Sequence, residues 1–245
     1  MPHQVFIGCG PEHQLPAAVL KHTIELHATE PITVHLLSDV EKEVPIPADW
    51  KKKVPTSFSL QRFLIPEACG YEGVGVYLDS DMLCFGDIAE LFKIPFDTGE
   101  TIHTSGGWQS AVMAISCEKV DWQIDRICQR LDDRKIKYGA LSNLRYDRSG
   151  VTSKLGLWWN WHDRTKQYRS WEREVKARNA TPWHHLPGPL KLLHYTTMNG
   201  MQPWISRKHA LCGLWENTLE SAVALGDITK MDIMAELYNG HCRPS

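Results

Sequence analysis

The start of the chain alternates short apolar runs with one amphipathic stripe. Residues 5–8 predict a strand that stops in the glycine-containing turn at 8–11. Apolar positions 17, 20, 24 and 28 share one face of a helix that Pro31 ends, and residues 32–37 predict a second strand. A strand, a helix and a strand over about 35 residues form a βαβ unit. This order predicts a parallel sheet in an α/β protein.

The same pattern continues with shorter elements. Residues 57–65 predict a short capped helix before Pro66. The remaining predictions are strands at 76–78 and 110–115, a second apolar stretch at 82–85, and a helix at 118–131. The α/β pattern therefore extends through the first half of the chain.

The hydrophobic pattern weakens after residue 134. Six of the ten tryptophans lie between residues 158 and 204, and residues 164–178 form a basic helical stretch. Such a stretch is usually a solvated helix face, and it also suits an anionic partner or, at most, peripheral contact with a membrane surface. We predict one domain, 1–245, with an α/β half at 1–134 and a closing segment at 135–245.

Composition excludes several classes of protein. With 245 residues, 42% of them hydrophobic and 23% charged, the chain is long and apolar enough for a substantial core. Its net charge of −2 argues against nucleic-acid binding. No apolar run reaches the roughly 18 residues of a membrane span, and no signal peptide is recognisable. Seven cysteines without a Cys-x-x-Cys pair indicate reduced thiols in a cytoplasmic protein.

Asp79 and Asp81 follow a predicted strand, where open α/β sheets bind their ligands. Two residues apart in extended chain, their side chains point the same way. Neighbouring carboxylates repel each other unless a cation lies between them. Magnesium and manganese take oxygen ligands and bridge carboxylates to phosphates. The pair therefore predicts a metal site, with a polar turn in which one aspartate caps the next segment as the alternative.

Several blocks in the same order resemble the family 8 glycosyltransferases, the glycogenin-like and lipopolysaccharide galactosyltransferase-like enzymes. The resemblance is densest between residues 56 and 92, where an arginine-bearing helical segment precedes the strand that ends in Asp79 and Asp81. The other matching blocks are 109–113, His194-Tyr195 and Gln202-Pro203-Trp204. Together the blocks cover roughly residues 4–205.

The resemblance implies a GT-A fold, with a mainly parallel Rossmann-like sheet and helices on both faces. It also implies a nucleotide-diphosphate sugar donor, usually of uridine, a manganese or magnesium ion, and hexose transfer with retention to a glycan, lipid or small-molecule acceptor. Asp79 and Asp81 match the metal-binding pair, and His194 matches the third protein ligand. The positions that match donor contacts are Gly8, Cys9, Arg62, Asp79 and Ser80.

Two positions depart from the family's motifs. Members often carry a lysine that meets the diphosphate where this chain has Gln202, which we keep as a donor contact. Members also carry an acidic–glutamine pair near the reacting sugar, and the matching segment here is 144–148. Asp147 is therefore one candidate at the anomeric carbon, and Gln109 is another.

The tryptophan-rich segment suits a sugar acceptor, because aromatic faces pack on apolar sugar faces. Trp159, Asn160 and Trp204 are the candidate acceptor contacts, and plain core packing is the alternative. His194 likewise has an alternative as a core histidine, because it follows the apolar strand predicted at 190–193.

Two other functions remain open. One is a catalytically impaired nucleotide-sugar-binding protein, which the changes at Gln202 and 144–148 favour. The other is a haloacid-dehalogenase-type phosphatase, in which the first carboxylate of Asp-x-Asp is the nucleophile. That family expects threonine or valine where this chain has Leu83, so the metal-dependent retaining glycosyltransferase is the principal hypothesis.

Overall fold

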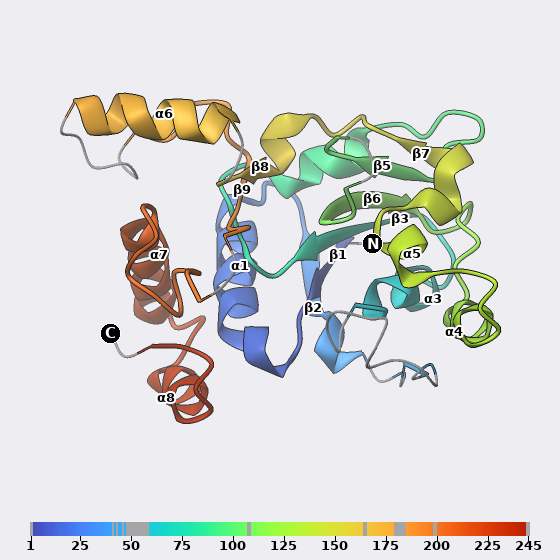
Figure 1. Ribbon diagram of the computed structural model, residues 1–245, viewed down its shortest axis with the longest axis horizontal. Helices are drawn as coiled ribbons and strands as arrows, with labels where there is room; N and C mark the ends of the chain where they lie inside the picture. Colours follow the sequence, from blue (N-terminus) through green and yellow to red (C-terminus); the bar gives the residue numbers. More distant parts are fainter. Residues whose placement is uncertain are drawn as a thin grey trace. The chain divides into compact units, whose positions relative to one another are not determined.

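Two units interleave along the chain in the computed structural model (Figure 1). The structure describes residues 2–40, 42, 44–45, 47, 59–106, 109–163, 166–178, 185–197 and 200–243, without the side chains of residues 147 and 148. Unit 1 consists of Met1–Gly10, Thr29–Asp79 and Ile88–Leu157, and unit 2 of Pro11–Ala28, Ser80–Asp87 and Trp158–Ser245. These boundaries differ from the division at residue 134, and the single domain stays a prediction.

Unit 1 contains a six-stranded sheet in the order β2-β1-β3-β6-β5-β7. Its strands are β1 (His3–Gly8), β2 (Ile32–Leu36), β3 (Val74–Asp79), β5 (Ile102–Thr104), β6 (Val112–Ser116) and β7 (Val151–Thr152). The pairs β1–β2, β1–β3 and β5–β7 are parallel, whereas β6 is antiparallel to both β3 and β5. The predicted βαβ order and the mainly parallel sheet are confirmed.

Short helices complete unit 1, and most of them pack into one apolar core. They are η2 (Leu37–Asp39), η3 (Gln61–Leu64), α3 (Ile65–Ala68), η4 (Ile88–Lys93), α4 (Ile124–Asp132), α5 (Tyr138–Ser142) and η5 (Arg145–Gly150). The helix expected at 118–131 begins only at Ile124. The backbone N–H of Val120 instead closes a turn on the Ser116 carbonyl, and Trp122 is buried edge-on against Phe63. The stretch before Ile124 is therefore a turn that buries Trp122, and the helix begins after it.

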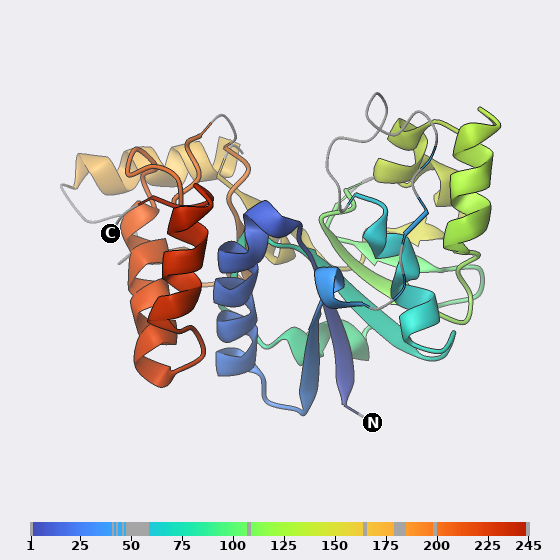
Figure 2. The ribbon, with the colours of Figure 1, turned by 90° about the horizontal axis from the view of Figure 1, so that it is seen from below.

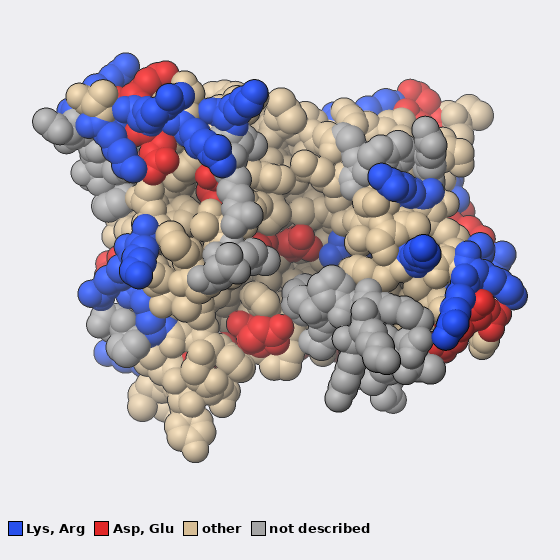
Figure 3. Space-filling model, viewed as in Figure 1, with Lys and Arg blue, Asp and Glu red and all other residues tan. Residues whose placement is uncertain are grey.

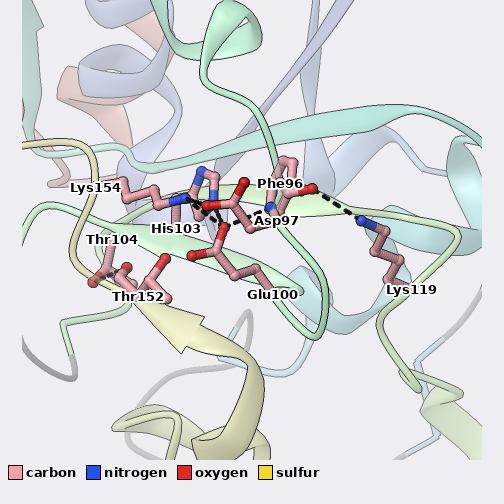
Figure 4. A network of polar contacts seen from close by, with 8 residues as sticks. All are labelled: Phe96, Asp97, Glu100, His103, Thr104, Lys119, Thr152 and Lys154. Carbon is pink, nitrogen blue, oxygen red and sulfur yellow. Dashed lines mark hydrogen bonds and ion pairs between the residues drawn. The ribbon is translucent and has the colours of Figure 1, made fainter.

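Glu100 is the centre of a polar cluster beside β5 and β7 in unit 1 (Figure 4). Its Oε2 accepts hydrogen bonds from Lys154 Nζ at 2.7 Å and from the Asp97 backbone N–H at 2.8 Å, and lies 3.1 Å from His103 Nε2. The Lys154 ammonium is the main reason that the pKa of Glu100 falls to about 2. Glu100 therefore ties the turn before β5 to the chain that follows β7.

Unit 2 contains a three-stranded sheet in the order β4-β9-β8. Its elements are η1 (Pro11–His13), α1 (Gln14–His27), β4 (Met82–Cys84), β8 (Trp161–His162), α6 (Lys166–Ala177), β9 (Leu192–His194), α7 (Cys212–Leu225) and α8 (Lys230–Tyr238), with η6 (Leu157–Trp159) at its border. Helices α1, α7 and α8 lie side by side (Figure 2). No helix in the described part of the chain combines the length and apolarity that crossing a membrane requires.

Candidate functional site

The sheet of unit 2 brings Asp81 and His194 together. Strands β4 and β9 are antiparallel with Met82 opposite His194, and the backbone N–H of Tyr195 donates to the Asp81 carbonyl at 2.9 Å. This register places Asp81 Oδ1 3.1 Å from His194 Nε2. The oxygen is buried and has no hydrogen-bond partner among the described residues. Two potential metal-ligand atoms therefore face the same small space.

Asn160 fixes the orientation of the His194 ring. Its side-chain Oδ1 lies 2.8 Å from His194 Nδ1, so the ring donates the Nδ1 proton to Asn160. In the neutral imidazole, Nε2 then carries a lone pair that faces the lone pairs of the Asp81 carboxylate. Two such atoms at 3.1 Å repel each other unless a proton or a metal cation lies between them.

Asp163 holds the chain just after His194, a role that the sequence did not suggest. Its fully buried carboxylate accepts from the backbone and hydroxyl of Thr196, from the backbone of Thr197, and from His209 Nε2 at 2.8 Å. Burial alone raises the pKa of Asp163, but the hydrogen bonds from His209 and the threonines outweigh it and keep that pKa well below its usual range. Asp163 is therefore an ionised anchor for the end of β9.

His162 stands beside His194, with the two rings edge to face at a centroid distance of 4.9 Å. Burial is the main cause, and the neighbouring His194 the second, that lowers the pKa of His162 to about 4. His162 is therefore neutral at physiological pH and adds no positive charge beside His194.

In unit 1, Asp79 ends β3 within a second polar cluster. The Tyr77 hydroxyl donates to Asp79 Oδ1 at 2.6 Å, and Arg62 lies 3.4 Å from the same oxygen. Arg62 is buried over the Tyr77 ring and also donates to the carbonyl and hydroxyl of Ser110. Burial raises the pKa of Tyr77 well above its usual value, so the phenol keeps its proton. Tyr77 precedes Asp79 by two residues on the same strand face, a signal that sequence reasoning missed.

Gly8 and Cys9 lie beside this cluster. Gly8 pairs with Asp79 in the parallel register of β1 and β3, and a Cβ at position 8 would collide with the Tyr77 ring. Only glycine fits there without displacing the tyrosine. Cys9 is fully buried, with its Sγ 3.4 Å from Ser38 Oγ.

The two candidates for the anomeric carbon lie in unit 1. Gln109 is exposed and lies just before β6, near the end of β3. There the backbone N–H of Asp79 donates to the Ala111 carbonyl at 2.9 Å. Asp147 belongs to η5, and its side chain lies outside the described residues, as do the motif positions 56–58. Both roles stay predictions.

The remaining predicted contacts lie in unit 2. Ser80 is buried and Gln202 is half-buried. Trp159 is buried beneath the Lys191 ammonium, and Trp204 is buried against Tyr195 and Trp215. An acceptor role for the two tryptophans and for Asn160 stays a prediction.

Comparison with known proteins bears on the fold. No protein-family model matches the chain. Over 92 residues, 37% of this chain and 36% of the other, it is 33% identical to Protein CDI of Arabidopsis thaliana. The structure is similar to galactosyltransferase LgtC solved with donor and acceptor sugar analogues, with a TM-score of 0.62 and 13% identity over 93% of this chain and 98% of that one.

It is also similar to the WbbM bifunctional glycosyltransferase, with a TM-score of 0.61 and 12% identity over 98% of this chain and 51% of that one. The chain thus matches about a third of the length of Protein CDI and half of the WbbM chain. The expectation of a mixed α/β architecture from the family resemblance is confirmed. This chain has the GT-A fold of these glycosyltransferases.

Proposed function

We propose that the chain is a metal-dependent, retaining glycosyltransferase of family 8. It transfers a hexose from a uridine-diphosphate sugar to a glycan, lipid or small-molecule acceptor. The observation that carries the proposal is the buried approach of Asp81 to His194, 3.1 Å apart with Nδ1 of the histidine held by Asn160. The GT-A fold supports it, because glycosyltransferases of that fold are the structural neighbours of this chain.

Asp79, Asp81 and His194 are the residues that would hold the metal. The donor set fits a manganese or magnesium ion, because carboxylate oxygens suit both ions and imidazole also suits manganese. Asp79 stands only two residues before Asp81, so the chain itself keeps both carboxylates within reach of one ion. When bound, the metal would offset the negative charge that the diphosphate gains as its bond to the sugar breaks.

The chain's own residues prepare these ligands. The Tyr77 hydroxyl and Arg62 both contact Oδ1 of Asp79 and so fix the orientation of its carboxylate. Asn160 presents His194 Nε2, and Asp163 fixes the backbone that follows that histidine. Side chains held in this way need little reorganisation when the donor binds.

The donor and the reacting sugar have further proposed contacts. Gly8 and Cys9 belong to the turn that receives the nucleotide, Ser80 lies between the two ligand carboxylates, and Gln202 meets the diphosphate. Gln109 is one candidate at the anomeric carbon, and its exposure near the end of β3, where Asp79 lies, supports this role. Asp147 is the second candidate.

A thermal-shift series tests the proposal. Uridine diphosphate and a panel of nucleotide sugars are added to the chain with and without manganese, and the melting temperature is recorded. We expect stabilisation that needs both nucleotide and metal. Radiolabelled hexose in an acceptor product then distinguishes a transferase from a protein that only binds the donor. Absence of any metal-dependent shift, or hydrolysis of a phosphate ester without nucleotide sugar, would overturn the assignment.

A further inference from the structure

Unit 1 contains a cavity whose wall includes residues 119–121, which follow β6. Its volume is about 780 Å³, within the range typical of small-molecule sites. The walls come from the turn before β5, the loop between β6 and α4, the end of α4, the start of α5, and η5. All of these segments belong to unit 1, so the cavity is formed within one unit.

Sheet topology places this cavity at the far end of β3. Strand β6 is antiparallel to β3, with Val112 opposite Leu78 and Ser116 opposite Val74. Asp79 therefore lies beside the start of β6, whereas the cavity wall at 119–121 follows its end. Five residues of strand separate the two ends by about 16 Å. A ligand against the wall at 119–121 would therefore not touch Asp79.

Basic side chains dominate the lining of the cavity. Its cations are Lys119, Arg130, Arg134, Lys135, Lys137 and Arg145, of which Lys135 is paired with Asp133 at 2.9 Å. Among the described lining residues Asp121 is the only acid, and its carboxylate is paired with Arg126 at 3.0 Å. Figure 3 shows Lys and Arg side chains gathered around α4, with acidic side chains among them. The whole chain carries a net charge of −2, so this concentration of positive charge is local.

Arg130 gives the cavity a fixed donor. Its guanidinium donates to the Tyr146 hydroxyl at 2.8 Å and lies 5.0 Å from the centre of that ring. The Nε–H of Arg130 is buried and has no hydrogen-bond partner among the described residues. A buried N–H of a charged group is costly to leave without an acceptor. The side chain as a whole lines the cavity, so an anion there would interact with its positive charge.

We infer that this cavity binds a small anion that carries phosphate, either a phosphate monoester or a diphosphate. Arginine and lysine are the side chains that bind phosphate oxygens best, arginine through paired N–H groups. The hydroxyls of Thr101 and Ser149 add neutral donors, and Ile136 gives an apolar contact for an organic part. A concave site rather than an extended basic stripe favours a small molecule over a nucleic acid.

The test is calorimetric titration of the whole chain without divalent metal. The probes are inorganic phosphate, pyrophosphate and glucose 6-phosphate. We expect saturable binding of at least one probe, weakened by salt. Equal affinities would assign recognition to the phosphate group, and tighter binding of glucose 6-phosphate would add a contact with the sugar. No saturable binding up to about 1 mM of any probe would overturn the inference.

Variants locate the binding. Arg145→Gln and Lys137→Gln, both exposed on the cavity wall, should each weaken it by about tenfold. The matched control is Arg169→Gln with Arg173→Gln on α6, which removes two exposed cations of unit 2 and should change nothing. Equal losses in the control, or affinity that grows with the length of a single-stranded oligonucleotide, would contradict a small-molecule site.

Two control measurements separate loss of anion binding from unfolding and from loss of the proposed metal site. Unchanged melting temperatures of the variants show that they fold. Asp81→Asn should bind the same probe as the native chain, because Asp81 belongs to unit 2 and to the proposed metal site. Failure of metal-dependent donor binding therefore leaves the anion site standing, and failure of the anion site leaves the transferase standing.

Discussion

Asn160 Oδ1 lies 2.8 Å from Nδ1 of His194 and so turns Nε2 of that ring toward Asp81. The contact joins residues 34 positions apart and is buried. Partners of this kind fix both the tautomer and the direction of a histidine ligand. The contact gives Asn160 a role in orienting His194, the proposed metal ligand.

Asn160→Leu should therefore lower manganese affinity by about 10- to 100-fold, because Nδ1 loses its acceptor and the ring can turn. Isothermal titration with manganese measures the effect. Asn160→Asp keeps an acceptor at the same place and should retain most of the affinity. A leucine variant that binds manganese as the native chain does would show that Asn160 does not position His194.

Asp81→Ala should abolish metal-dependent binding of uridine diphosphate, because it removes the carboxylate that faces His194. The fold should persist, since Asp81 is joined to β9 through its backbone carbonyl, which alanine keeps. Calorimetric titration with nucleotide, with and without manganese, gives the readout. Unchanged binding by a folded variant would remove Asp81 from the site.

Asp163→Ala should cost about 3–5 kcal/mol of unfolding free energy, because it leaves His209 and two backbone N–H groups buried without their acceptor. Urea unfolding measures the loss. The control is Glu25→Gln in the same unit, which removes a surface ion pair with Lys21 at 3.9 Å. It should change the free energy of unfolding by less than about 0.5 kcal/mol. A loss in Asp163→Ala no larger than in the control would contradict the anchoring role.

The lowered pKa of Glu100 predicts that the protein loses stability in acid. Its pKa is about 2 in the fold against an ordinary value of 4.5, mainly because of Lys154. A lowered pKa means that the ionised carboxylate favours the fold, so its contribution is complete above pH 4.5 and disappears as pH falls toward 2. Urea midpoints between these pH values should fall more steeply in the native chain than in Glu100→Gln. Parallel curves would show that the Glu100 network does not favour folding.

Much of the fold could be predicted because its strands and helices carry clear periods. The runs that became β1, β2, β3 and β6 were visible in the sequence, as was α1. Strands β5, β7 and β8 have only two or three residues, too few to show a period. They exist because neighbouring strands offer them hydrogen bonds, which a local pattern does not reveal.

Some residues of the candidate site could likewise be predicted from the sequence, and others could not. Asp79, Asp81 and His194 came from spacing and family resemblance. Asp163 and the support that Asn160 gives His194 depend on contacts across 30 residues or more. Asn160 attracted attention only for the tryptophans beside it, whereas its side chain contacts His194 in β9. Residues that support a ligand leave little local signal.

Gly8→Ala tests how tightly the Asp79 cluster is built. The new methyl group would collide with the Tyr77 ring, whose hydroxyl donates to Asp79. We expect a loss of about 1–3 kcal/mol in unfolding free energy, typical of overpacking, because the ring or the strand must move. Gly139→Ala in α5 is the control, since a Cβ there meets nothing within 4 Å and should leave stability unchanged or slightly raised. Urea unfolding of both variants decides the point, and equal stabilities would mean that the turn after β1 has room for a side chain.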